Sequence, residues 1–408
     1  MQLIETAPES EACDSADWTN ETIESLVDAP VRYGVVQVGE DTHDGVPIVA
    51  IKFVKEIDHA PLHRTSRKLE EPYAGSRVSP GDVLISIKGT IGRVGVVPKG
   101  FFGNISRELA RIRVKETVCP EYIAYQLESG ATQRRIFNSV VGTTRLEFSI
   151  ATLRKFEIPV PPTLDEQRAI AGALSDVDAL LGVLDRMLTK KRDLKQAAMQ
   201  QLLTGQTRLP GFKGKWKEKT LGSLAKIQRG ASPRPIDLPI WFDDYSSIGW
   251  VRISDVTKSG MYLKSTRQRL SPLGVENSRP VDRGNLLMSM CATVGRPIIT
   301  DIDVCIHDGF VVFDKLSANL KFTYYVLQAI EKDWSKHGQT GSQMNLNTDL
   351  IKGTEVCIPS DKDEQTAIAE VLSDMDAEIV ALERRREKTQ DLKQGMMQEL
   401  LTGKTRLV

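Results

Sequence analysis

Three short patterns in the sequence could carry chemistry, and none has the full spacing that its chemistry requires. A G-K-T tripeptide at 403–405 resembles the end of a phosphate-binding loop, but Gln398 stands where that loop needs its first glycine. His59 and His63 are four residues apart, yet Pro61 between them is incompatible with a helical pair of metal ligands. The sequence also lacks a G-x-G-x-x-G segment after a predicted strand. We therefore predict no catalytic, cofactor-binding or metal-binding residue.

Basic and polar residues on predicted loops form a different chemical pattern, which suits DNA. Lys and Arg neutralise phosphates, whereas Arg, Asn, Gln, Ser and Thr also bond to base edges. The candidates in the first half of the chain are Arg64, Arg67, Lys88, Thr90, Arg93, Asn104, Thr143, Thr144 and Arg145. Those in the second half are Arg229, Arg234, Arg252, Arg267, Arg269, Thr293, Arg296, Ser342, Gln343 and Asn345. Any one alone is more often a solvated surface residue, but clusters at matching places in both halves favour DNA contact.

Two of these clusters occupy the same place in the two halves. Residues 142–145 and 340–343 each lie just before the two halves return to a common register. We hypothesise that these loops enter a groove of DNA. Replacing Arg145 or Gln343 with alanine should then change the DNA sequence that is recognised.

The elements that must position these residues are present twice. Residues 165–209 and 363–407 are identical at 27 of 45 positions, at a constant offset of 198 residues. Apolar residues spaced alternately by four and three predict a long helix with a coiled-coil seam, and Gly205 and Gly403 mark its expected ends. The predicted pairing residues are Ile170, Leu174, Val177, Leu181, Leu184 and Leu188, and in the second copy Ile368, Leu372, Met375, Ile379 and Leu382. Periodicity does not explain why the seam is polar beyond Leu188.

Six residues of the two predicted helices lie off this seam and are nevertheless the same in both copies. They are Gln196, Met199 and Gln200 with their counterparts Gln394, Met397 and Gln398. The helices could simply pack on each other and bind nothing else. Identical residues outside the seam instead favour two identical partners, one for each copy.

Composition limits the class of protein. The net charge is zero, so no overall field draws the chain to nucleic acid or membrane. The five cysteines contain no C-x-x-C pair, which predicts free thiols in a reducing compartment. No apolar run approaches the roughly 18 residues of a membrane span, and the first 17 residues are acidic rather than signal-like. These features predict a cytoplasmic protein with a loose N-terminal tail.

The repeat also predicts the domain organisation. We expect a tail at 1–17, a globular domain at 18–164, a helix at 165–209, a second globular domain at 210–362 and a second helix at 363–408. Each globular domain mixes predicted strands and helices, so the expected fold class is α+β. Strands are expected at 46–54, 81–87 and 94–97 and again at 250–256, 284–290 and 297–300, with helical stretches at 120–137 and 322–334. The T-x-G-R turns at 90–93 and 293–296 predict a hairpin-like corner between the second and third strand of each half. The offset drifts to 203 inside the domains and returns to 198, as expected if the two interiors read different targets.

This arrangement resembles the specificity (S) subunit of type I restriction-modification enzymes. The resemblance covers residues 18–407 and rests on the D-E-Q-x-A-I-A runs from Asp165 and Asp363, the W-x4-L-G-x-L opening at Trp216 and the two L-L-T-G-x-T-R-L helix ends. It implies two target-recognition domains that read a bipartite, asymmetric site in double-stranded DNA. It also implies an antiparallel coiled coil with a pseudo-twofold repeat.

The resemblance further implies the partners. Two DNA methyltransferase (M) subunits would dock on the helices, and restriction (R) subunits would join through them. Adenine-N6 methylation and ATP-dependent cleavage would belong to those subunits, which would bind S-adenosylmethionine, ATP and Mg²⁺. This chain itself would be non-catalytic, with no cofactor of its own.

Two other functions stay open at this point. A standalone DNA-binding regulator would explain the paired readers but not the duplicated residues outside the seam. A non-catalytic coiled-coil scaffold without nucleic acid is favoured only by the zero net charge. A pull-down with the neighbouring operon products, assayed for methyltransferase activity, would separate the three.

Overall fold

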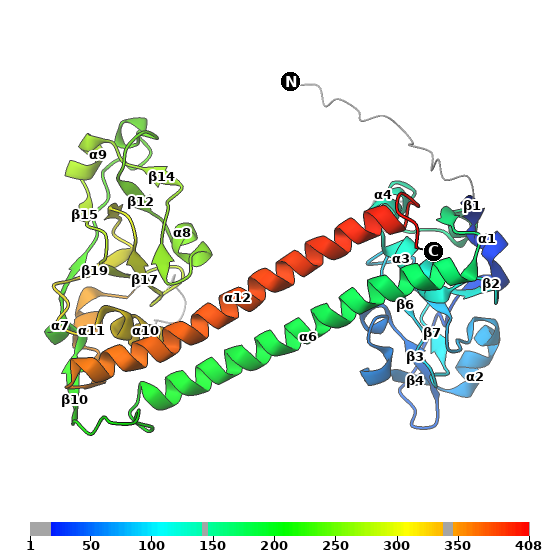
Figure 1. Cartoon of the computed structure of the whole chain (residues 1–408), viewed down its shortest axis with the longest axis horizontal. Coiled ribbons are helices and arrows are strands. Elements are labelled where there is room, and N and C mark those ends of the chain that lie inside the picture. The colour runs from blue at the N-terminus through cyan, green and yellow to red at the C-terminus, as the bar shows by residue number, and fades with distance from the viewer. Residues whose placement is uncertain (1–17, 141–145, 338–345, 408) are drawn as a thin grey trace. The chain divides into compact units, whose positions relative to one another are not determined.

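The computed structural model describes residues 18–140, 146–337 and 346–407, and the chain divides into two compact units. Unit 1 contains Met1–Asp185 and Arg384–Val408, and unit 2 contains Arg186–Glu383. Each unit holds one globular domain and a part of both long helices, α6 (Leu164–Leu202) and α12 (Lys362–Leu400) (Figure 1). Both domains mix strands with helices, so the predicted α+β class and the two long helices are confirmed.

The globular domain of unit 1 is built on three sheets. The four-stranded sheet has the order β2-β8-β5-β6, the three-stranded sheet β4-β3-β7, and β1 pairs with β9. The strands are β1 (Thr19–Thr22), β2 (Val27–Tyr33), β3 (Val46–Val49), β4 (His63–Thr65), β5 (Val83–Ser86), β6 (Val94–Val96), β7 (Asn104–Ile105), β8 (Leu109–Val114) and β9 (Glu157–Val160). The helices are α1 (Ile23–Leu26), α2 (Arg67–Glu70), α3 (Pro120–Glu128), α4 (Gly130–Asn138) and α5 (Ile150–Arg154), with 3-10 turns η1 (Ile51–Phe53), η2 (Ile57–His59) and η3 (Glu71–Ser76).

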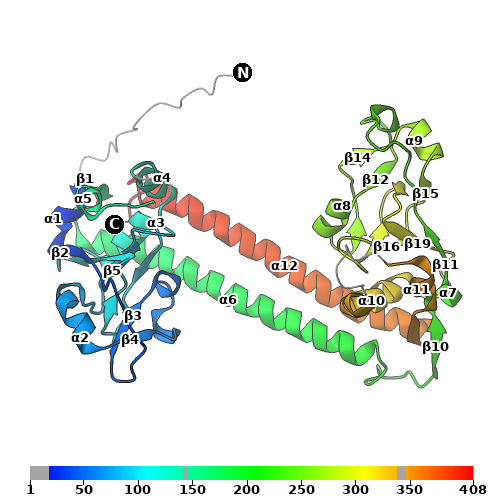
Figure 2. The same cartoon turned by 180° about the vertical axis from the view of Figure 1, so that it is seen from behind.

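Unit 2 repeats this plan, with one more strand in each of its two larger sheets. The orders are β11-β19-β16-β17-β13 and β14-β12-β18-β15, and β10 pairs with β20. The strands are β10 (Trp216–Thr220), β11 (Lys226–Arg229), β12 (Gly249–Val251), β13 (Tyr262–Leu263), β14 (Gln268–Arg269), β15 (Arg279–Val281), β16 (Leu286–Ser289), β17 (Pro297–Thr300), β18 (Val304–Ile306), β19 (Phe310–Asp314) and β20 (Glu355–Pro359). The helices are α7 (Leu221–Leu224), α8 (Ile253–Lys258), α9 (Pro272–Glu276), α10 (Leu320–Ile330) and α11 (Thr348–Gly353), with η4 (Pro239–Trp241) and η5 (Glu331–His337). Figure 2 shows α10 and α11 beside the five-stranded sheet.

The predicted hairpins are confirmed, while several element bounds are corrected. β5 pairs antiparallel with β6, and β16 pairs antiparallel with β17. The strand expected at 46–54 ends at Val49 and continues as η1, and the strand expected at 250–256 ends at Val251 before α8. The Asp255 carboxylate starts α8 by accepting the Arg252 backbone N–H at 2.9 Å, as an acidic residue in a first helical turn can. The helical stretch 120–137 is broken at Ser129, whose hydroxyl accepts the Thr132 N–H and caps α4.

Each long helix contributes to the core of a globular domain. In unit 1, Ile170 and Leu174 of α6 and Leu400 of α12 share one apolar cluster with Tyr122 and Phe148. In unit 2, Leu202 of α6 and Ile368 and Leu372 of α12 belong to the cluster around Phe322 and Tyr325. Both helices end before a glycine with positive φ, +72° at Gly205 and +74° at Gly403, a conformation that favours glycine. The long helices are therefore integral parts of the folded units rather than linkers.

The predicted pairing residues are mostly shielded from solvent. Buried are Ile170, Leu174, Leu181, Leu184, Leu188, Ile368, Leu372 and Ile379. Val177, Met375 and Leu382 are half-buried. In unit 1 the pairs Asp178–Lys393 and Asp185–Arg386 show that α6 and α12 run antiparallel, because the residue numbers rise on one helix as they fall on the other. In unit 2 the pairs Lys191–Glu378 and Lys195–Asp376 show the same direction.

The polar part of the seam, which periodicity leaves unexplained, is a pair of equivalent ionic layers. In unit 1 the Asp178 carboxylate accepts from Lys393 Nζ at 2.8 Å and from the Tyr125 hydroxyl at 2.8 Å. In unit 2 the Asp376 carboxylate accepts from Lys195 Nζ at 2.6 Å and from the Tyr325 hydroxyl at 2.7 Å. Burial and the neighbouring Asp178 carboxylate raise the pKa of Tyr125, so this phenol stays a hydrogen-bond donor at neutral pH. Each layer joins both long helices to a helix of the globular domain.

The cysteines differ in burial, and thiol labelling can test this difference. The four that the structure describes, Cys119, Cys291, Cys305 and Cys357, are free thiols. Burial raises the pKa of Cys119 and that of Cys305 to about 11, so about one thiol in a thousand is ionised at pH 8. Cys357 is exposed. We expect iodoacetamide at pH 8 to label Cys357 well before Cys119 or Cys305, as followed by peptide mass spectrometry; equal labelling rates would contradict the packing.

Candidate nucleic-acid interface

Three backbone segments cross in the same way in both units, and we call each crossing a loop junction. In unit 1 it consists of residues 34–36, 86–88 and 105–108, and in unit 2 of residues 230–232, 289–291 and 306–309. Val35 N–H donates to the Ile105 carbonyl at 2.8 Å, and Ile87 N–H donates to the Glu108 carbonyl at 2.8 Å. The unit 2 junction repeats both bonds, from Ala231 to Ile306 at 3.0 Å and from Met290 to Gly309 at 2.7 Å. The two units therefore share a backbone frame at this place.

A glycine lets the segments of each junction approach this closely. A Cβ atom on Gly230 would overlap the His307 carbonyl oxygen, and one on Gly34 would overlap that of Ile105. We expect Gly230→Ala to lower the free energy of unfolding by about 1–3 kcal/mol, because the overlap is with backbone that must shift. Chemical denaturation would measure this. Gly260→Ala is the matched control in the same unit, since no atom beyond its chain neighbours lies within 4 Å of its Cβ position; equal losses for both variants would argue against the close approach.

The unit 1 junction carries basic side chains. Lys88 follows β5 and its ammonium lies 3.4 Å from the Glu147 carboxylate. Arg107, at the turn between β7 and β8, is about half exposed and its guanidinium bonds to Glu108 at 3.0 Å. Thr90 is exposed on the turn that follows Lys88. These residues offer donors of the kind that contact phosphate oxygens or base edges.

The unit 2 junction has different side chains on the same frame, and they converge on Asp308. The Asp308 carboxylate accepts from the Ser232 hydroxyl at 2.8 Å and from Arg234 Nη2 at 3.1 Å. Its backbone carbonyl accepts from Arg229 Nε at 2.7 Å. Burial alone would raise the pKa of Asp308, but the Ser232 hydrogen bond and the Arg234 charge outweigh it and hold the pKa below its usual range. Asp308 is therefore ionised at neutral pH.

His307 supports the same turn. Its ring lies 5.8 Å from Trp250 and 4.9 Å from Phe310 between ring centroids. Burial lowers the pKa of His307, and its Nδ1 accepts the Gly309 N–H at 2.9 Å, which requires that nitrogen to be unprotonated. The turn that presents Asp308 is thus packed against Trp250 and Phe310 and is hydrogen-bonded to its own backbone.

The remaining predicted DNA contacts are dispersed. Arg93 and Arg296 line the grooves described below. Arg64 lies on β4 and Arg67 on α2, both exposed. The others in unit 2 are Arg252 before α8, Arg267, Arg269 on β14 and the half-exposed Thr293. The predicted residues Thr143, Thr144, Arg145, Ser342, Gln343 and Asn345 lie outside the described residues.

Asn104 is the one predicted DNA contact that the structure places in the interior. It has no exposed surface. Its amide donates to Glu70 at 2.7 Å and to the Tyr73 carbonyl at 3.0 Å, and its oxygen accepts from Ser76 at 2.8 Å. With its side chain fully hydrogen-bonded, Asn104 stabilises the fold of unit 1, so the prediction that it contacts DNA is wrong.

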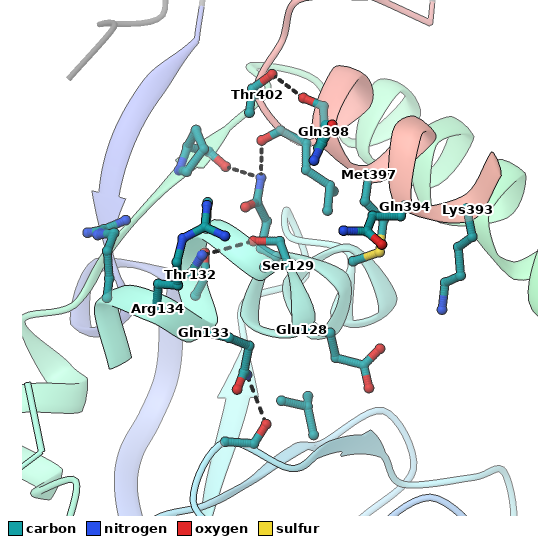
Figure 3. A pocket seen from close by; sticks show the side chains of 18 of the residues that line it. Glu128, Ser129, Thr132, Gln133, Arg134, Lys393, Gln394, Met397, Gln398 and Thr402 are labelled. Atoms are coloured by element: carbon teal, nitrogen blue, oxygen red, sulfur yellow. Dashed lines mark hydrogen bonds between the residues drawn. The ribbon is translucent and has the colours of Figure 1, made fainter. Parts of the chain in front are cut away.

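A groove in each unit is lined by equivalent positions at the end of a long helix and in the two residues that follow it. In unit 2 these are Lys195, Gln196, Met199, Gln200, Leu203 and Thr204. In unit 1 they are Lys393, Gln394, Met397, Gln398, Leu401 and Thr402, each 198 residues later (Figure 3). The grooves have volumes of about 1460 and 900 Å³, respectively. All six predicted docking residues are among these lining residues.

The opposite walls of the grooves come from the globular domains and differ between the units. In unit 1 this wall includes Glu128 at the end of α3, Ser129 before α4 and Gln133 on α4 (Figure 3). In unit 2 it includes Gln328 and Glu331. Gln126 Nε2 donates to the Leu401 carbonyl at 2.7 Å and fixes the end of α12 against α3. Each groove therefore has one wall that is the same in both units and a second wall, from the globular domain, that differs between them.

Sequence reasoning did not single out Asp308 or His307. Acidic residues repel DNA phosphates, so a search for DNA contacts passes over an aspartate. The available signal was the H-D-G turn between two apolar segments, V-C-I and F-V-V-F, which marks an exposed tip between buried strands.

Comparisons with known proteins agree on one family. The family model described as "Type I restriction modification DNA specificity domain" matches twice, at residues 18–186 and 213–393. The EcoBI specificity subunit of Escherichia coli is 26% identical over 199 residues, which are 47% of this chain and 42% of that protein. The putative MjaX specificity subunit of Methanocaldococcus jannaschii is 26% identical over 415 residues, covering 96% of this chain and 94% of that protein.

The fold agrees with these matches. The crystal structure of a type I restriction-modification system S subunit from M. genitalium aligns with a TM-score of 0.62 and 16% identity, covering 97% of this chain and 99% of that one. Within the described residues, no helix is both long and apolar enough to cross a membrane.

Proposed function

Because the chain belongs to the type I restriction-modification DNA specificity family, we propose that its two globular domains each read one half of a bipartite, asymmetric DNA site. The loop junctions would present the reading residues. The chain would supply sequence specificity only, and its partners would carry out methylation of adenine and cleavage of DNA.

The observation that carries this proposal is the pair of loop junctions. Their backbone hydrogen bonds are the same, yet Arg107 stands in unit 1 where unit 2 has Asp308. Constant backbone with different exposed side chains is what two readers of unlike sequences require, because base edges are distinguished by the donors and acceptors that meet them. The exposed arginines nearby, Arg229 and Arg234, suit phosphate or guanine contacts.

We further propose that the two grooves dock two DNA methyltransferase subunits. The duplicated wall, with a methionine between two glutamines in each copy, offers the same apolar and hydrogen-bonding surface twice. Met side chains adapt to a partner surface, and Gln amides can donate and accept across an interface. Restriction subunits would join through the methyltransferases, and S-adenosylmethionine, ATP and Mg²⁺ would bind to those partners. A cytoplasmic location, predicted from the cysteines, belongs to the same proposal.

Mapping of modified adenines tests the reading function. DNA from cells with and without this gene would be sequenced with a method that detects N6-methyladenine. We expect one bipartite motif with unlike halves to lose its methylation when the gene is deleted. Retention of every methylated motif after deletion would refute the proposal, and DNA binding without any methylation would favour a standalone regulator.

A further inference from the structure

We propose that Asp308 is a specificity-determining positioning residue, which holds Arg234 in place to read a base in the half-site of unit 2. This inference rests on the proposed reading function. The role is unexpected for an acidic residue, because a carboxylate near DNA repels the phosphates and by itself weakens binding.

Asp308 bonds to the last residue of β11 and to two residues of the segment that follows it. Its carbonyl accepts from Arg229 Nε at 2.7 Å, and its carboxylate accepts from Ser232 and Arg234 at 2.8 and 3.1 Å. Arg279 Nε adds a bond to the Arg229 carbonyl. One residue on the β18–β19 turn therefore bonds to three of the residues that lead up to and include Arg234.

The turn that presents Asp308 is itself held firmly. His307 is packed against Trp250 and Phe310, and the Gly309 N–H closes onto His307 Nδ1. Met290 N–H donates to the Gly309 carbonyl across the junction. Asp308 can thus impose a position on Arg234 rather than follow it.

Stability does not account for the Asp308–Arg234 pair. The Arg234 side chain is 69% exposed and that of Asp308 is 43% exposed. Exposed pairs of this kind add little to folding stability, because water screens the charges and ordering two side chains costs entropy. Holding an exposed arginine in one orientation instead lowers the entropy that it must lose when it binds.

Arg234 retains the means to read a base while it is held. Among the described residues, Asp308 is the one acceptor that bonds its guanidinium, through Nη2. The other N–H groups remain for a ligand with two acceptors on one edge, and guanine, with O6 and N7 in the major groove, is the base of that kind. We therefore assign a guanine contact to Arg234.

Within the described part of unit 1, no aspartate stands at the equivalent place. Arg107 occupies the place of Asp308 and bonds to its own neighbour Glu108 at 3.0 Å. The effect of replacing Asp308 should consequently be confined to one half of the bipartite site.

Asp308→Asn tests the proposal, with Asp301→Asn as its matched control. Asp301 lies before β18, at the end opposite to Asp308, and pairs with the exposed Arg283 at 2.8 Å. Both variants remove one negative charge from an Asp–Arg pair of unit 2. The full chain in complex with its methyltransferase subunits would be titrated with three duplexes: the site mapped for the wild type, and the same site with either half scrambled.

For Asp308→Asn we expect affinity for the intact site to fall about tenfold or more, the loss typical of one missed base contact. Affinity for the duplex whose unit 2 half is scrambled should stay equal or rise, because a negative charge is gone. The control should change affinity for intact and scrambled duplexes by the same factor. A uniform change for Asp308→Asn as well, or no change, would overturn the proposal.

A double-mutant cycle tests whether Asp308 acts through Arg234. If Asp308 acts through Arg234, then Asp308→Asn has no further effect on discrimination in an Arg234→Ala background. An undiminished second loss there would show that Asp308 meets the DNA itself, contrary to the proposal. Melting temperatures would confirm that all variants fold.

The titration also separates this inference from the proposed reading function. If the wild-type complex preferred no duplex, the proposed reading function would fail. If it preferred the site and Asp308→Asn left this preference unchanged, only the present inference would fail.

Discussion

Arg208→Ala is expected to lower the free energy of unfolding by about 3–5 kcal/mol, the cost of leaving a buried charge without its partner. Arg208 follows α6 and bonds through Nε and Nη2 to both carboxylate oxygens of Glu364 in α12, at 2.5 and 2.7 Å. The Glu364 side chain is completely buried. Without Arg208, the buried carboxylate would lose the cation that holds both of its oxygens. Chemical denaturation of the full chain on its own would measure the loss.

Arg192→Ala is the control for that variant. Arg192 pairs with Glu383 at 2.6 Å in the same unit, but both side chains are about half exposed, so the expected loss is about 0–1 kcal/mol. Replacing both members of the buried pair, as in Arg208→Met with Glu364→Leu, should restore most of the stability, because no charge is then left buried. Equal losses for the Arg208 and Arg192 variants would show that burial of Glu364 is not the cause.

Met199→Asp is expected to release one methyltransferase subunit from the complex, Met397→Asp the other, and the double variant both. A carboxylate placed in a docked apolar contact must lose its hydration, so the affinity of that site should fall about a hundredfold or more. Native mass spectrometry would count the subunits directly. The two single variants should give complexes of the same mass, because the grooves share their duplicated wall.

Val183→Asp controls for the added charge. Val183 is 42% exposed on α6 and is not among the residues that line either groove, so this variant should retain both methyltransferase subunits. Met199 also packs against the core of unit 2, and its variants would therefore be accompanied by melting curves. A correctly folded Met199→Asp complex that keeps both subunits would place docking elsewhere.

The parts of the fold that the sequence predicts are those with local signals or a duplicate. The β5–β6 and β16–β17 hairpins follow from an apolar strand and a Gly-containing turn, T-x-G-R, in both copies. The extent of α6 and α12 follows from one seam with a glycine at its end. Such signals lie within a few residues of the element that they specify.

What the sequence does not predict depends on partners far away along the chain. The ionic layer of unit 1 joins Tyr125, Asp178 and Lys393, and no periodicity within α6 or α12 indicates that a tyrosine of α3 completes it. The sequence suggests that Asn104 contacts DNA, because its buried partner Glu70 lies 34 residues before it and no local pattern links the two. Asp308 became a candidate only when the fold brought Arg229, Ser232 and Arg234 to it.

The division into units sets the order in which the protein can complete its folding during synthesis. Unit 2 is one continuous stretch, Arg186–Glu383, whereas unit 1 needs Arg384–Val408 as well as the first part of the chain. Leu400 and Leu401 belong to the core of unit 1. The domain that leaves the ribosome first therefore cannot complete its core until Leu400 and Leu401 have emerged, whereas the domain made second can complete its own core before then.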